Sequence, residues 1–152
     1  MHTGFQYVTC GSSLKLLNTY HNVRLHSHDV KYGLGSGQQS VTAVESSDDH
    51  NSYWQVRAKT GTHCVRGQPI KSGQTIRLMH LQTRRNLHSH HFQSPLSHNL
   101  EVSPFGEDGE GDEVISTWLV KRLVARSQVS VKCPPIHHPV ILTTGRQWRG
   151  ST

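Results

Sequence analysis

The sequence has few charged residues, few cysteines and no long hydrophobic segment. Charged residues make up 17% of its 152 residues and hydrophobic residues 33%. Ser, Thr, Gly, Gln, Asn and His fill the remainder, which is typical of a polar globular domain and not of a charged disordered tail. No stretch approaches the roughly 20 apolar residues of a membrane span, so we expect no membrane insertion. The length predicts one domain over residues 1–152.

Catalytic and nucleotide-binding motifs are also missing. The sequence contains no Gly-x-Ser-x-Gly motif and no context that would activate a thiol, so we expect no enzyme. Its net charge is +6, but the basic residues form no block interleaved with aromatics, which argues against a nucleic-acid partner. The glycines at 33, 35 and 37 lack the following Gly-Lys-Ser/Thr of a phosphate-binding loop and predict a flexible hairpin loop.

An internal repeat is the most informative feature of the chain. The segment from Gly11 to Leu16 recurs as Gly73 to Leu78, and Leu-His-Ser-His at 25–28 recurs at 87–90, in both cases 62 positions later. Further segments match at nearly the same spacing, with slips that we place in loops: 41–44 with 102–105, and 52–56 with 116–120.

The repeated unit predicts an all-β fold. Each unit has four short segments that alternate apolar and polar residues and are separated by turn formers, which indicates four strands and almost no helix. A weaker third copy, at 129–132 and 140–145, matches the first two strands. Three such units form a β-trefoil, here with ten strands instead of twelve and with an open sheet edge. We place repeat one at 7–60, repeat two at 66–122 and an incomplete repeat three at 123–152.

The three cysteines are Cys10, Cys64 and Cys133, and none forms a Cys-x-x-Cys pair. Cys10 and Cys64 bracket the first unit. Two interpretations remain open: a disulfide between them, as an oxidising compartment would allow, or two buried thiols.

Two groups of polar residues are candidates for binding. His26, His28, His88 and His90 alternate along strands as zinc ligands can, although packing and turn hydrogen bonds at equivalent repeat positions explain them more simply. The acidic loop, whose members include Glu107, Asp108, Glu110 and Asp112, offers oxygens for calcium, a solvated surface or a contact for basic partner segments. We assign no metal and no cofactor to either group.

Several motifs together resemble one known family. The motifs lie at 8–11, 14–18, 23–28, 35–42, 51–54, 87–92, 94–97 and 107–112. Over about residues 7 to 120 the chain is similar to the stromal cell-derived factor 2 family of MIR-domain proteins.

The resemblance implies a fold, a compartment and a role. It implies a β-trefoil of three MIR motifs, residence in the lumen of the endoplasmic reticulum, and no catalysis. It further implies partnership with a lumenal J-domain co-chaperone and an Hsp70, keeping misfolded clients soluble. The module also resembles the lumenal domain of protein O-mannosyltransferases and parts of calcium-release channels.

Both ends of the chain differ from that family. The family begins with a cleaved signal peptide and ends in a His-Asp-Glu-Leu type retention signal, whereas this chain starts with Met1-His2 and ends with Ser151-Thr152. We therefore expect neither signal in it. The similarity fades after Trp118, and we interpret residues 121–152 as a truncated, diverged third motif, with a splice variant or a misread frame as alternatives.

The first functional hypothesis is a non-catalytic module that binds misfolded chains at polar loops and apolar spots. A carbohydrate reader linked to O-mannosylation and a non-functional truncated isoform are the alternatives. The apolar spots are expected around Tyr32, Trp54, Phe92, Phe105 and Trp118, with the tryptophans more often in a core than on a surface. The candidate surface comprises Tyr32 and Phe92 together with the four histidines and four acids named above.

Overall fold

The computed structural model describes residues 8–18, 20–71, 73–95 and 97–110 and the strands at 118–123, 128–132 and 142–143. In these residues the fold is all-β, and its one helical turn is a 3-10 helix at His50–Ser52. These residues form eleven strands where the sequence predicts ten, because the predicted first strand is divided into β1, which pairs with β5, and β2, which pairs with β3. The strands are β1 (Ser13–Leu14), β2 (Leu17–Asn18), β3 (Val23–Lys31), β4 (Gln39–Val44), β5 (Trp54–Ala58), β6 (Thr75–His80), β7 (Asn86–Gln93), β8 (Leu100–Phe105), β9 (Trp118–Leu123), β10 (Gln128–Lys132) and β11 (Leu142–Thr143).

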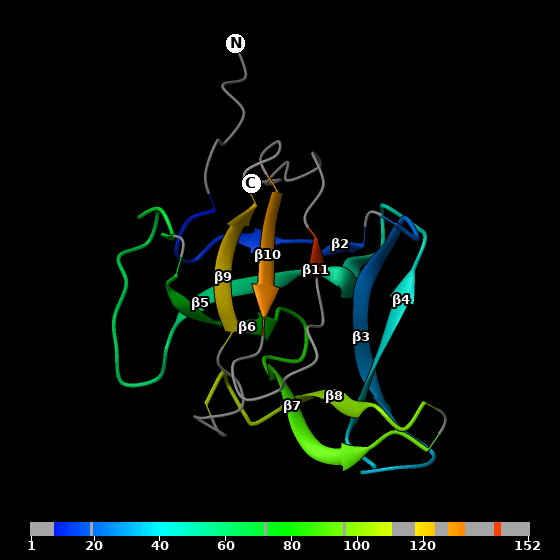
Figure 1. The fold of residues 1–152 in the computed structure, drawn as a ribbon. Helices are drawn as coiled ribbons and strands as arrows, with labels where there is room; N and C mark the ends of the chain where they lie inside the picture. Colours follow the sequence, from blue (N-terminus) through cyan, green and yellow to red (C-terminus); the bar gives the residue numbers. More distant parts are fainter. Residues whose placement is uncertain are drawn as a thin grey trace.

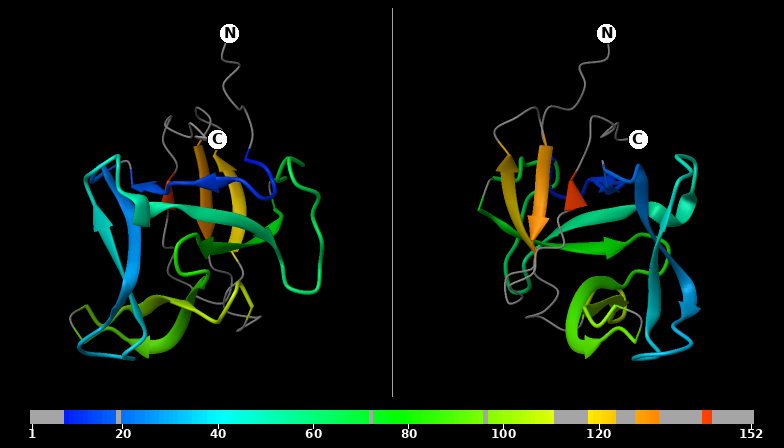
Figure 2. Two further views of the ribbon diagram at one scale, coloured as in Figure 1. Left: turned by 180° about the vertical axis from the view of Figure 1, so that it is seen from behind. Right: turned by 45° about the vertical axis from the view of Figure 1, so that its right-hand side comes forward.

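The barrel is built from the first and fourth strands of the repeats. The order of hydrogen-bonded strands in this sheet is β1, β5, β6, β9, β10 and β11. Because the last strand, β11, also contacts β2, which follows β1 in the sequence, the sheet curves round toward its first strand. The β3–β4 and β7–β8 hairpins project from this barrel (Figures 1 and 2). Contacts between β4 and β8 bring the two hairpins together.

The two hairpins are structural copies of one another. In repeat one His26 pairs with Thr42, and in repeat two the equivalent His88 pairs with Ser103. Both hairpins also shift register at the same place, between Ser27 and Lys31 in one and between Ser89 and Gln93 in the other. A register shift of this kind bends the strand and increases its twist. The predicted repeat is therefore confirmed at the level of strand register.

The barrel strands repeat in the same way. Leu14 pairs with Trp54, and the equivalent Ile76 pairs with Trp118. The first and fourth strands of the two repeats therefore share one backbone register.

A single hydrophobic core fills the barrel. Trp54 and Val56 are fully buried, and the Trp54 indole N–H donates to the carbonyl oxygen of Leu25 at 3.1 Å. Trp54 therefore lies in the core, the location that the sequence favoured for the tryptophans, whereas Phe92 and Phe105 are 44% and 40% exposed. The other buried members of this cluster are Leu14, Leu16, Ile76, Leu78 and Leu87.

The third repeat differs from the other two in its connections. In repeat one, the first and fourth strands are separated by residues 19–53, and in repeat two by residues 81–117. In the third repeat, β10 and β11 are separated by residues 133–141 alone. β11 pairs with β10 on the flank opposite β9 and contacts β2. It therefore lies between the third repeat and the first, where the sequence predicts an open edge.

In repeats one and two, the turns after the first strand share one geometry, which arises from two residue types. Asn22 and Arg84 occupy equivalent positions, with φ of 53° and 57°. In repeat one the Asn18 side-chain oxygen accepts from the backbone N–H groups of Tyr20 and His21. In repeat two the ring nitrogen Nδ1 of His80 replaces that oxygen and accepts from the Thr83 N–H at 3.3 Å.

The imidazole of His80 is fully buried and neutral. Its Nε2–H donates to the carbonyl oxygen of Asn51 at 2.9 Å, and its ring lies 4.9 Å from that of Trp54. Burial lowers the pKa of His80 below its ordinary value of 6.5, because the charged form would lose its hydration. Below about pH 6.5, His80 therefore binds a proton more readily in the unfolded chain than in the folded chain.

A disulfide joins Cys10 to Cys64, which lie 54 residues apart in the sequence with a Cα–Cα distance of 6.1 Å. It connects the segment before β1 to the loop between β5 and β6. The sequence left open either a disulfide or two buried thiols, and the structure contains the disulfide.

Removal of this disulfide should lower stability substantially. In the chain-entropy treatment, a cross-link closing a loop of this size contributes about 4 kcal/mol to the free energy of unfolding. Cys10→Ser with Cys64→Ser should therefore shift urea denaturation to lower concentration by a corresponding amount. An unchanged midpoint, with the disulfide verified by mass spectrometry in the parent, would contradict the assignment.

Replacement of His80 by asparagine, the residue at the equivalent position of repeat one, should weaken the dependence of stability on pH. For the parent, the free energy of unfolding should fall as the pH drops below about 6.5, because the unfolded state takes up the proton. At pH 7.5, His80→Asn should cost about 1 kcal/mol for the lost Nε2 hydrogen bond, and this cost should shrink toward pH 5. Gln82→Ala, in the same turn, is the matched control; a cost for His80→Asn that stays constant with pH would disprove the account.

Candidate binding groove

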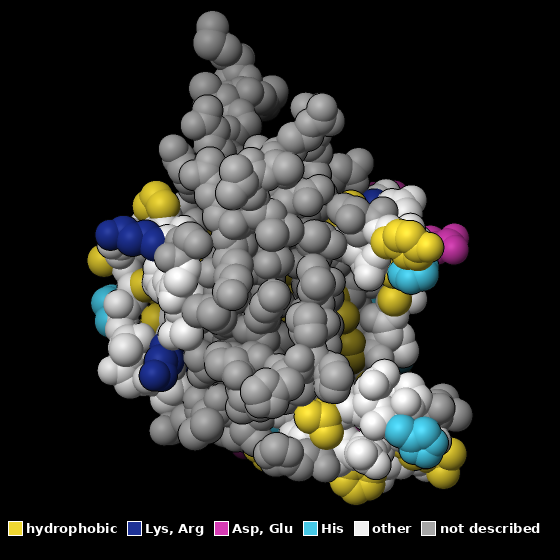
Figure 3. Space-filling view, viewed as in Figure 1, with side chains coloured by type: hydrophobic (Ala, Val, Ile, Leu, Met, Phe, Trp, Pro, Cys, Tyr) yellow, Lys and Arg dark blue, Asp and Glu magenta, His cyan; other side chains and the backbone are white. Residues whose placement is uncertain are grey.

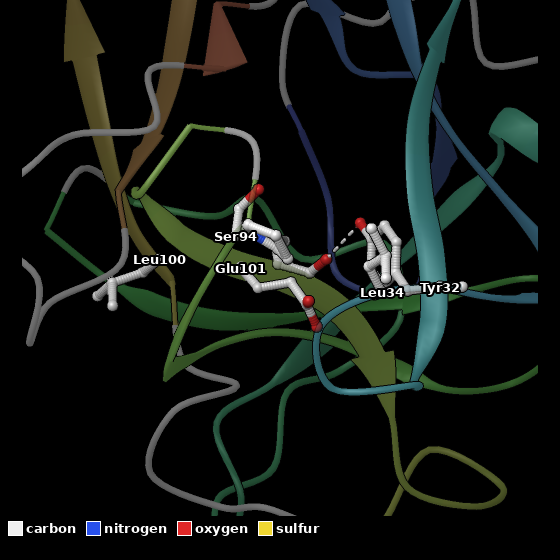
Figure 4. Close-up of a pocket in the computed structure, with 8 residues that line it drawn as sticks. Tyr32, Leu34, Ser94, Leu100 and Glu101 are labelled. Atoms are coloured by element: carbon white, nitrogen blue, oxygen red, sulfur yellow. Dashed lines mark hydrogen bonds between the residues drawn. The ribbon is translucent and has the colours of Figure 1, made fainter.

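A groove of about 460 Å³ lies between the tips of the two hairpins. One side is formed by the loop after β3 and the other by the loop after β7 and by β8 (Figure 4). Most of its lining is apolar, with the Glu101 carboxylate among the few polar groups. The lining residues are Tyr32, Gly33, Leu34, Ser94, Pro95, Leu100, Glu101 and Val102.

Tyr32 ties the two hairpins together at the edge of this groove. Its hydroxyl accepts from the Val41 N–H at 2.9 Å, and the carbonyl oxygens of Val102 and Val41 lie 3.0 and 3.1 Å away. One phenol thus satisfies backbone groups on the edges of both β4 and β8. Burial raises the pKa of Tyr32, and the nearby Glu101 charge adds to the effect, so the hydroxyl keeps its proton.

Glu101 is the buried acid of the groove, with 6% of its surface exposed. It accepts hydrogen bonds from the Ser36 hydroxyl, from the Ser36 N–H at 3.3 Å and from His90 Nε2 at 3.2 Å. Gly35 adopts φ of +90°, and a Cβ at this position would collide with the Glu101 carboxylate. The glycine-rich loop therefore folds over this acid because residue 35 has no side chain.

Exposed apolar side chains border the groove. Leu34 is 71% exposed, and the Phe92 ring lies 6.1 Å from the His90 ring, close enough to Gly35 that a Cβ there would contact it. Hydrophobic side chains and a histidine are visible at the hairpin tips, at the lower right of the space-filling view (Figure 3). Tyr32, His90 and Phe92, three of the candidates chosen from sequence, therefore lie around one site.

The histidines of repeat one form a separate network. His26 Nδ1–H donates to Asp49 at 2.5 Å, which leaves Nε2 to accept from His28 Nδ1–H at 2.8 Å. Partial burial opposes ionisation of Asp49, but the hydrogen bond from His26, together with those from the Asn51 backbone and the Ser52 side chain, outweighs it and lowers the pKa of that carboxyl. These side chains are held by one another and do not face the groove.

The histidines of repeat two stack instead. The rings of His88 and His90 lie 4.9 Å apart, and His88 Nδ1 donates to the Ser103 carbonyl oxygen at 2.7 Å. Within the part of the chain that the structure describes, no three His, Cys, Asp or Glu side chains gather as metal ligands. The zinc hypothesis for the four histidines therefore has no geometric support there.

The acidic loop carries its own counter-charges. Glu110 lies 3.8 Å from Arg57 and 3.7 Å from Arg77, and Asp108 accepts from Arg84 at 3.1 Å. Glu107 is exposed, whereas Asp112 lies outside the described residues. Because two of its carboxylates already pair with arginines of the same chain, this loop is tied to β5, β6 and the turn after β6.

Sequence reasoning missed Glu101, Leu34, Pro95 and Leu100. The sequence did carry a signal for Glu101. Because successive side chains of a strand point to opposite faces, this acid is predicted to lie on the face of the strand opposite to Leu100 and Val102. The signal for the others was absent, since a loop residue meets its neighbours across a groove only after both hairpins have packed.

Among the described residues, no helix has the length and apolar character needed to cross a membrane. The sequence model of the MIR domain matches residues 15–123. Together with two register-matched hairpins on a curved sheet, this match defines a MIR-domain protein with a β-trefoil fold.

Relatives specify the family. Mouse stromal cell-derived factor 2 is 71% identical over 113 residues, which is 74% of this chain and 53% of that protein. The crystal structure of the SDF2-like protein from Arabidopsis thaliana superposes with a TM-score of 0.78 at 44% identity, covering 84% of this chain and 73% of that one. The chain belongs to the stromal cell-derived factor 2 family and spans about half the length of the curated relatives it matches.

A more distant likeness supports the fold alone. The Saccharomyces cerevisiae protein O-mannosyltransferase Pmt1-Pmt2 complex bound to the sugar donor has a TM-score of 0.68 at 22% identity, covering 93% of this chain and 24% of that one.

Substitution of Gly35 by alanine should open the loop over Glu101. Gly35 and Gly37 both adopt positive φ, but only at Gly35 would a Cβ meet another residue within 4 Å. Gly37→Ala should therefore cost about 1 kcal/mol for its backbone conformation, and Gly35→Ala should cost at least about 1 kcal/mol more. Chemical denaturation measures both, and equal costs would show that the contact with Glu101 is unimportant.

Proposed function

We propose that this chain is a non-catalytic binding module of protein quality control in the endoplasmic reticulum. In this proposal it holds misfolded polypeptides while partnered with a lumenal J-domain co-chaperone and an Hsp70. Membership of the stromal cell-derived factor 2 family supports the assignment. The Cys10–Cys64 disulfide suits the oxidising lumen of that compartment.

The groove between the hairpins is the observation that carries the proposal. It is mostly apolar, and Leu34 and Phe92 leave hydrophobic surface exposed beside it. Such a site binds through burial of apolar side chains and requires no particular sequence, as unfolded clients demand. Its small size favours weak, reversible binding.

The polar networks support binding in preference to catalysis. His26 and Asp49 have the arrangement of a general base and its orienting acid, but the second nitrogen of His26 meets His28, an imidazole, and not a hydroxyl or thiol nucleophile. The network is therefore suited to holding β3 in place.

Suppression of aggregation tests this function. The full chain with its J-domain partner should slow light scattering by a chemically denatured client, and Leu34→Ser with Phe92→Ser should weaken the effect by about threefold or more, because burial of both side chains is lost. Val65→Ser is the matched control, since Val65 is 63% exposed but does not line the groove.

Two results would overturn the proposal. Absence of any effect of the parent chain on aggregation would remove the client-binding role. If Val65→Ser lost as much suppression of aggregation as the groove variant, the client-binding role would not depend on the groove. A mannose signal on a glycan array without client binding would favour the carbohydrate reader instead.

A further inference from the structure

The charge of Glu101 has no permanent counter-charge within the described ranges. Four arginines pair with other acids: Arg57, Arg77, Arg84 and Arg85. Among the residues that the structure describes, the one ion pair of Glu101 is with His90. A carboxylate that is 6% exposed would ordinarily be compensated by a lysine or arginine, because burial of a charge without one is costly. The site is therefore electrostatically suited to a cation from outside.

The carboxylate also has an unused acceptor position. Two carboxylate oxygens offer about four lone-pair sites in all. Within the described part of the chain, the Ser36 hydroxyl and His90 donate to Oε1, and the Ser36 N–H, at 3.3 Å, is the one donor to Oε2. Glu101 can therefore accept a further hydrogen bond while the loop remains closed over it.

The walls around Glu101 match the stem of a basic side chain. Leu34, Pro95 and Leu100 line the groove with apolar groups. Glu101 lies between Leu34 and Leu100 in the close-up (Figure 4). Lysine and arginine bury their methylene stems against apolar surface while the charged end makes polar contacts. A basic residue within an apolar segment would therefore satisfy both parts of the lining.

We propose that the groove recognises extended polypeptide segments in which a lysine or arginine lies beside apolar residues. This inference rests on the proposed client-binding function and specifies the class of segment bound. The basic side chain pairs with Glu101, and a neighbouring apolar side chain contacts Leu34 and Leu100. Because the chain as a whole carries a charge of +6, long-range electrostatics oppose a basic ligand, so a preference for one must come from a local contact.

Fluorescence polarisation with two labelled heptapeptides tests the inference. The peptides share a leucine-rich sequence and differ only at the central residue, lysine in one and norleucine in the other. The full chain should bind the lysine peptide about fivefold to tenfold more tightly, as a partly buried, charge-assisted pair would give. Acetylation of that lysine should reduce its affinity to that of the norleucine peptide.

Two variants locate the effect. Glu101→Gln keeps the size of the side chain and should abolish the preference for lysine, so that the lysine and norleucine peptides bind with equal affinity. Glu107→Gln removes an exposed acid outside the groove and should leave the preference intact. Far-ultraviolet circular dichroism of both variants monitors folding, and the acetylated peptide tests the same contact with the parent chain if Glu101→Gln does not fold.

The outcomes separate the two proposals. Equal binding of the lysine and norleucine peptides would overturn the charge-based recognition and leave apolar client binding in place. A preference that Glu107→Gln abolishes as fully as Glu101→Gln would also overturn it, because the charge effect would then be non-local. No measurable binding of either peptide, together with no suppression of aggregation, would overturn the proposed function itself.

Discussion

Pairing of the barrel strands around Trp54 is the constraint on which the rest of the structure depends. Leu14 pairs with Trp54 and Ile76 with Trp118, and these equivalent pairs place the first and fourth strands of two repeats in one curved sheet. Burial of the core cluster inside that sheet fixes where each hairpin leaves the barrel. The separation between the hairpin tips, and hence the groove, follows from the positions of these strands.

The contact between the hairpins is polar, in contrast to the barrel core. Tyr32 bridges the edges of β4 and β8, and Gln39 connects β4 to Thr83 and Arg85 in the turn after β6. Pro104 lies in β8, an edge strand, where its missing N–H removes no ladder hydrogen bond. Directional hydrogen bonds thus set the angle between the hairpins, while exposed apolar side chains remain free for a ligand.

The sequence predicted the fold far better than the site. The spacing of 62 residues located both hairpins, because copies of a segment fold alike. The structure adds that both hairpins shift register at the same place, after Ser27 and after Ser89. The same spacing made His26 and His88 equivalent candidates for a binding site. In the structure, His26 pairs with Asp49, whereas His88 donates to the backbone carbonyl of Ser103. Equivalent positions in a repeat share backbone geometry, but their side-chain partners come from segments that are not repeated.

The sequence by itself determined which residues form strands, which of their faces are apolar and which segments are copies, because alternation and turn residues act over a few neighbouring positions. Tertiary structure alone decided that Glu101 lies under the loop at Gly35 and that Tyr32 joins two repeats. The physical reason is distance along the chain. Ser36 and Glu101 are 65 residues apart in sequence, and no local pattern encodes a contact that forms only when two hairpins pack on one barrel.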